Sequence, residues 1–279
     1  MLTRLAIRLY ACASVAAFAA IAAAPAAAQF KPPPAGEPVV GELYHIEGSA
    51  GLWWPSANIL ITSSGSGNLA GIVGTGIDLK RDLGLTDQRV PDIAIVLRPA
   101  RSHKFRFQYA PIKYDQAATL SRDIVFNGQR YSINLPVNST LQWSAYRFGY
   151  EYDFIVKDRG FGGFIIEAKY TDVQVLLTAP LISEFARARA PIPALGGIGR
   201  YYVIPNVSIT GEVTAFKLPT IQNKYTGHYV DVDIYGTVNF TSNVGAQLGF
   251  RTMDVGYLVK TDSGSMTLKG LYLGIVARY

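Results

Sequence analysis

The sequence has one cysteine, Cys12, which lies within the first 28 of its 279 residues. A chain that loses these residues cannot be held together by disulfides, so a large closed sheet is the expected alternative. No apolar run after residue 28 approaches the roughly 20 residues of a spanning helix. No membrane-spanning helix is therefore expected after residue 28.

Charge is also scarce, since only 16% of the residues are charged. Without Arg4 and Arg8, 24 basic residues (26 − 2) face 20 acidic ones, a net charge of +4. This excess is too small and too scattered to indicate a nucleic-acid partner. The 27 glycines and 17 tyrosines favour strands over helices.

The N-terminus has the organisation of a secretory signal peptide. Arg4 and Arg8 precede an Ala-rich apolar run that ends in Ala26–Ala28. A short charged region, an apolar region and small residues before a cleavage point are typical of an exported protein. We therefore predict a signal peptide over 1–28 and a Pro-rich periplasmic lead-in over 29–41. A retained membrane helix is the less favoured alternative.

Apolar and polar side chains alternate through the rest of the chain. In HYVDVDIYGTVNF (228–240), Val230 and Val232 alternate with Asp231 and Asp233. Period-two alternation indicates strands with one polar and one apolar face. The predicted strands are 42–54, 89–98, 103–115, 138–153, 161–176, 191–204, 206–216, 228–241, 243–258 and 264–279.

Short and long connections alternate between these strands. Short ones fall near 98–103, 156–161, 204–207 and 241–244, and longer ones near 55–88, 116–137, 177–190 and 217–227. Tight turns at one end and long loops at the other are typical of transmembrane barrels. The sequence thus predicts an all-β fold, an antiparallel up-and-down transmembrane β-barrel over 42–279. About ten strands are expected; twelve is the alternative, because 55–88 could hold a further pair.

The last strand carries a recognisable ending, YLGIVARY. It resembles the C-terminal strand signal of Gram-negative outer-membrane β-barrels, with Tyr272, Gly274, Ala277 and Tyr279 in the expected places. The resemblance implies a location in the cell outer membrane and insertion by the barrel assembly machinery. GIDLKRDLGL followed by HKFRFQY also resembles a widespread group of small bacterial barrels without an assigned activity.

The polar faces carry charges of both signs. On the lipid side at mid-depth a charge would cost roughly 2–4 kcal/mol, so these faces are expected to line the lumen. The predicted lumen-lining charges are Arg98, Lys104, Arg106, Arg147, Glu151, Asp153, Glu167, Lys169, Arg200, Glu212, Asp231, Asp233, Arg251 and Arg278.

Catalytic signals are weak. His228 with Asp231 or Asp233 and a hydroxyl such as Ser183 or Thr226 would form a nucleophile constellation, but the spacing does not require it. Metal sites need clustered ligands, which the sequence does not show. We therefore predict no enzyme, no catalytic residues, no metal and no cofactor.

Two functional classes remain open. The preferred hypothesis is a narrow, porin-like channel or carrier for small polar solutes with a charged lumen. The alternative is a non-conducting structural or interaction barrel whose lumen is bridged by ion pairs. An outer-membrane lipid-modifying hydrolase is a remote third. Expected partners are outer-membrane lipids and lipopolysaccharide, which the basic segment 184–191 could contact unless it is a solvated loop; the oligomeric state is open.

Overall fold

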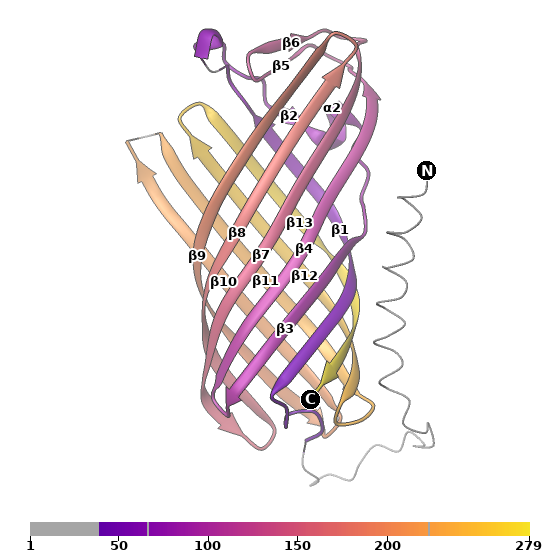
Figure 1. Cartoon of the computed structure of the whole chain (residues 1–279), viewed down its shortest axis with the longest axis vertical. Helices are drawn as coiled ribbons and strands as arrows, with labels where there is room; N and C mark the ends of the chain where they lie inside the picture. The colour runs from indigo at the N-terminus through magenta and orange to yellow at the C-terminus, as the bar shows by residue number, and fades with distance from the viewer. Residues whose placement is uncertain (1–38, 66, 223) are drawn as a thin grey trace, which may run out of the picture.

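The computed structural model describes residues 39–65, 67–222 and 224–279. The predicted signal peptide and nearly all of the predicted lead-in lie outside these residues. Ten antiparallel strands form one closed barrel (Figure 1). They are β1 (Ile46–Thr62), β3 (Val90–Ala100), β4 (His103–Thr119), β7 (Pro136–Lys157), β8 (Gly160–Ala179), β9 (Ile182–Ile204), β10 (Val207–Ile221), β11 (Tyr225–Asn239), β12 (Val244–Val259) and β13 (Asp262–Arg278).

Each barrel strand pairs with the next barrel strand along the chain, and the last returns to the first. β13 pairs with β1 from Glu47↔Arg278 to Thr62↔Ser263 without a register shift. Closure leaves no free sheet edge at the seam where the chain ends meet, which is how barrels avoid the cost of unpaired edge strands.

The predicted number of ten strands is confirmed, but the predicted strands were too short on the loop side. β8 and β9 meet across only two residues, 180 and 181, so the long loop expected over 177–190 is wrong. Most of the loop expected over 217–227 is likewise strand. The predicted strands ended where outward side chains stop being apolar. The hydrogen-bonded ladder continues beyond that point with polar side chains outward, as at Asp172 and Arg187.

Two long connections lie at the end of the barrel opposite the C-terminus (Figure 1). Residues 63–89 contain η1 (Gly67–Leu69), β2 (Ile77–Asp78) and α2 (Leu79–Leu83), and residues 120–135 contain the hairpin of β5 (Ile124–Phe126) and β6 (Gln129–Tyr131). None of these short strands is inserted into the ring of ten, so the twelve-strand alternative is not adopted. Among the described helices, none has the length and apolar character to cross a membrane.

The helix α2 has a clear local cause. The Asp78 carboxylate accepts hydrogen bonds from the backbone N–H groups of Lys80 and Arg81, as an N-cap does. Gly84 ends the helix with φ of 64°, a left-handed conformation that glycine adopts without a steric penalty. One short turn is thereby fixed beside the barrel wall.

Alternation along each strand separates two faces. On β13, Leu271, Leu273 and Ile275 are exposed on the outside, while Val276 and Arg278 are buried inside. The interior has two layers: a polar half near the chain ends and an apolar half beneath the long loops. The apolar half contains Trp53, Ile59, Ile112, Tyr114, Leu141, Trp143, Leu177, Met253 and Leu268, together with Leu79, Leu83, Ile124, Phe126 and Tyr131 from the loops.

Candidate functional site

The polar half of the lumen is the candidate site. Each of the fourteen predicted lumen-lining residues lies at an inward strand position, and its side chain is buried or half-buried. Burying charge is costly unless opposite charges pair and their hydrogen-bonding capacity is met. In this lumen, arginine and lysine side chains are paired with carboxylates from neighbouring and opposite strands.

The central contact joins opposite walls. Arg106 on β4 donates to Glu151 at 2.6 Å and to Glu212 on β10 at 2.7 Å. β7, β8 and β9 lie between β4 and β10 in the ring, so this ion pair spans the lumen. Arg147 on β7 donates to both Glu167 and Glu212. Glu212 therefore receives guanidinium groups from two different strands, and its side chain is only 5% exposed.

A second set of pairs lies around Asp231. Its carboxylate accepts from Lys169 at 3.1 Å and from Arg251 at 2.8 Å. Arg251 continues across the lumen to Asp92 on β3 at 3.1 Å. Sequence reasoning missed Asp92, although Asp92 alternates with outward Ile93 and thus carried the same signal as the residues that were found.

Nearer the chain ends, Lys104 is 2.7 Å from Glu151 and 2.9 Å from Asp153. Arg278 donates to Glu47 at 2.5 Å, again with both side chains buried. Glu47 was not among the predicted lumen residues, although it follows the outward-facing Ile46.

The segment before β1 crosses the mouth of the barrel at this end. The Glu42 carboxylate accepts from Arg200 on β9 at 2.8 Å and lies 3.6 Å from Arg98 on β3. The Tyr202 hydroxyl donates to the same carboxylate at 2.9 Å. Tyr44, 7% exposed, lies under the guanidinium groups of Arg98 and Arg278. The strand predicted to begin at residue 42 begins at Ile46 instead, and the segment before it docks through tertiary contacts that alternation does not indicate.

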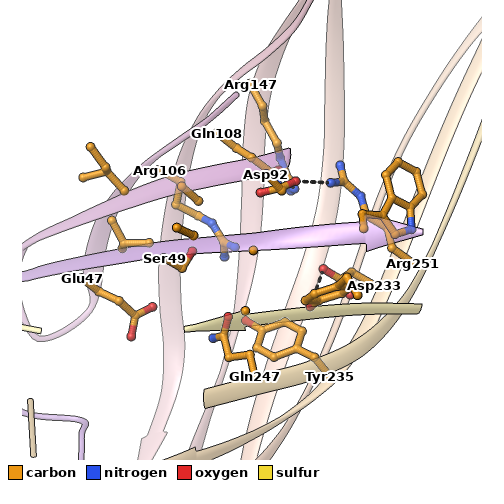
Figure 2. A pocket seen from close by; sticks show the side chains of 18 of the residues that line it. Glu47, Ser49, Asp92, Arg106, Gln108, Arg147, Asp233, Tyr235, Gln247 and Arg251 are labelled. Atoms are coloured by element: carbon orange, nitrogen blue, oxygen red, sulfur yellow. Dashed lines mark hydrogen bonds and ion pairs between the residues drawn. The ribbon is translucent and has the colours of Figure 1, made fainter. Parts of the chain in front are cut away.

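A cavity of about 90 Å³ remains among these charges (Figure 2). A water molecule needs about 10–15 Å³ of such volume, so a few waters fit and a larger solute does not. Asp92, Arg106, Arg147, Asp233 and Arg251 line it. Tyr272 donates to one Asp233 oxygen at 3.2 Å, and the other has no protein partner, so it faces this space.

The histidines do not form the nucleophile constellation. His228 points outward and lies 3.0 Å from Asp254, whereas Asp231 and Asp233 are on the inward face of the same strand. The Thr226 hydroxyl donates to a backbone carbonyl. Ser183 lies 3.4 Å from the Thr178 hydroxyl instead.

The four residues of the C-terminal signal occupy the end of β13 and the chain terminus. Tyr272 and Gly274 are on the inward face, with Gly274 paired to Gly51 of β1, while Ala277 and Tyr279 are on the outward face. Their role in insertion stays a prediction. The basic segment 184–191 is part of β9 and not a loop; Arg187 and Arg189 both contact Asp172, at 2.6 and 3.2 Å.

Known proteins match this chain in structure only. No protein-family model and no curated sequence matches it. The outer membrane protease OmpT of Escherichia coli superimposes with a TM-score of 0.60 at 8% identity, over 84% of this chain and 96% of that one. The toluene transporter TodX of Pseudomonas putida covers 84% and 90% at 7% identity with a TM-score of 0.36. The translocator domain of the autotransporter NalP of Neisseria meningitidis covers 84% and 88%, with a TM-score of 0.38 and 7% identity.

The closed ring of ten strands and the similarity to OmpT show the fold of an outer-membrane β-barrel. The prediction that it is not an enzyme is contradicted, because a protease is built on the same kind of barrel. At 8% identity this likeness shows the fold alone and assigns no reaction.

Proposed function

We propose that this barrel is a non-conducting outer-membrane scaffold whose lumen is closed by ion pairs and whose loop-side half presents an interaction surface. The observation that carries the proposal is the contact of Arg106 with Glu212, which ties opposite walls together at 2.7 Å. Conduction would require a path past this pair and past Arg147, and the cavity beside them holds only a few waters.

Closure at both ends supports the same function. At the periplasmic end Glu42 bridges Arg98 and Arg200 from different walls. At the loop end the apolar layer excludes hydrated ions, because moving a charge out of water without a partner is strongly unfavourable. Leu83 and Phe126 from the two long loops are buried in that layer, at 1% and 0% exposure. A channel for small polar solutes is thus the less favoured hypothesis.

Single-channel recording in planar bilayers tests the proposal. We expect no stable conductance from the unmodified protein, with insertion checked separately by the gel mobility of the folded barrel in vesicles. Stable, ion-selective steps from the unmodified protein would overturn the proposal in favour of the channel.

A matched pair of variants locates the block. Arg106→Ala with Arg147→Ala removes the cross-lumen guanidinium groups, whereas Arg187→Ala with Arg189→Ala removes two arginines from the outer face. We expect brief openings from the first pair of substitutions and none from the second. Conductance that appears equally in both pairs would show that the ion pairs are not what closes the lumen.

A further inference from the structure

The ladder between β9 and β10 ends half-way along the barrel wall. It runs from Val207↔Ile204 to Ala215↔Leu195. Beyond that point β9 continues to pair with β8 and β10 with β11. In the part of the chain that the structure describes, residues 182–194 and 216–221 therefore form no ladder with each other. Figure 1 shows the β10–β11 hairpin leaning away from the β8–β9 hairpin.

Prolines keep the β9 edge from closing. The backbone N–H of Tyr202 donates to the backbone carbonyl of Arg159, which directly precedes β8. The register between β8 and β9 has no shift over 182–201. The backbone N–H groups of successive strand residues point alternately toward the two neighbouring strands. Since the N–H of the even-numbered Tyr202 points toward β8, the N–H groups of odd-numbered β9 residues point toward β10. Pro191 and Pro193 are odd-numbered, so two donors are missing from the edge that faces the gap.

The β10 edge has the same property. Asn239 of β11 donates its backbone N–H to the carbonyl of Asn206, just before β10. The backbone groups of even-numbered β10 residues therefore point toward β11, and those of odd-numbered residues point toward β9. Pro219 is odd-numbered and lies in the stretch where the register shifts between Leu218 and Ile221. Because proline has no backbone N–H to donate, the prolines on both edges disfavour a ladder between β9 and β10 here. They also disfavour the addition of a peptide strand to either edge.

Apolar side chains are half-exposed behind the unpaired edges. Ala186 and Ile192 on β9, Phe216 on β10 and Val173 on β8 point inward and pack against the buried apolar cluster. Unlike the fully buried Leu177 in the same cluster, they keep part of their surface accessible. An acyl chain that enters between β9 and β10 would therefore meet apolar side chains on the inner side of the wall.

The outer surface changes character at the height where the gap begins. Leu195, on the last paired step, is 65% exposed and apolar. Above it, Arg187 and Arg189 share the one carboxylate of Asp172, which leaves a net charge of +1, and their side chains are 41% and 52% exposed. Lys217 is exposed on the β10 side. Apolar surface below and basic surface above fit an anionic headgroup at the membrane boundary.

We propose that this gap is a lateral binding site for a long-chain anionic amphiphile of the outer leaflet. The acyl chain would pass between β9 and β10 onto Ile192 and Phe216, and the anionic group would contact Arg187 and Arg189. This site does not depend on whether the lumen conducts. The proposal of a binding site can therefore be wrong while the proposed scaffold function is right, and the scaffold function can be wrong while the binding site is right.

Photolabelling of the full chain in lipid nanodiscs tests the site. The probe is hexadecanoate with a diazirine at the chain end, and labelled peptides are mapped by mass spectrometry. We expect saturable labelling of inward positions on β9 and β10 above Leu195, reduced at least tenfold by Phe216→Asp. The matched control is Ile61→Asp, because Ile61 is also half-buried against the apolar cluster but on β1; it should change labelling less than twofold.

The headgroup is tested with hexadecanol carrying the same diazirine. Arg187→Glu with Arg189→Glu should lower labelling by hexadecanoate about tenfold and leave labelling by hexadecanol unchanged. Hydrogen exchange of 182–194 and 216–221 should slow on addition of hexadecanoate. Labelling confined to outward residues such as Leu195, or an equal effect of Phe216→Asp and Ile61→Asp, would overturn the proposal.

Discussion

Glu212 illustrates how one residue can hold several strands together. It lies on β10 and accepts from Arg106 of β4 and Arg147 of β7, so its removal would leave two guanidinium groups short of a partner. Its inward position was predictable, because it alternates with outward Val213. Its partners were not, because alternation gives the face of a residue and not its height relative to a strand three or four places away.

We expect Glu212→Ala to destabilise the barrel by about 3–5 kcal/mol, since removing one partner of a buried ion pair leaves uncompensated charge. The comparison is Asp115→Ala, which breaks the exposed pair with Lys113 and should cost less than about 1 kcal/mol. Urea unfolding in detergent measures both. Equal losses for the two variants would show that the lumen pairs contribute no more than surface ones.

At the scale of elements, the loop segment that carries α2 is held by a buried carboxylate. Asp82 accepts from Arg122 at 2.6 and 3.1 Å and from the backbone N–H of Asp78 at 2.9 Å. Its side chain is 1% exposed. The hydrogen bonds from Arg122 hold the pKa of Asp82 well below its ordinary value. Asp82 thereby fixes α2 to the loop 120–135, which carries Arg122.

This lowered pKa predicts that acid releases the segment. Because the folded-state pKa is below the unfolded one, the stabilisation is complete above the ordinary pKa of about 3.9 and is lost as the pH falls below it. Hydrogen exchange of residues 77–85 should therefore accelerate below about pH 4 while the barrel strands stay protected. Asp82→Asn should show fast exchange already at pH 7, unlike Asp115→Asn. Unchanged exchange at low pH would contradict the assignment.

For the whole molecule, the sequence was sufficient for the ring of ten strands and for the direction of each face. Both follow from local alternation, as at Asp231 and Asp233, and from the rule that lipid-facing charge is costly. The height of the loop-side wall and the docking of Glu42 were not predictable, because both depend on contacts between distant segments. The gap between β9 and β10 left a trace in Pro191 and Pro219, although alternation alone does not indicate which ladder they interrupt.

The two faces of β11 can be distinguished at neighbouring residues. Val232 points outward on β11 and Asp233 inward, where the Tyr272 hydroxyl donates to it at 3.2 Å. Val232→Arg places a charge against lipid and should lower folding stability by about 2–4 kcal/mol, whereas Asp233→Asn keeps an acceptor for Tyr272 and should have little effect. The folded fraction in liposomes, measured by gel mobility across a urea series, separates the two. Equal effects of the two substitutions, or a larger effect of Asp233→Asn, would overturn the assignment of the two faces of β11.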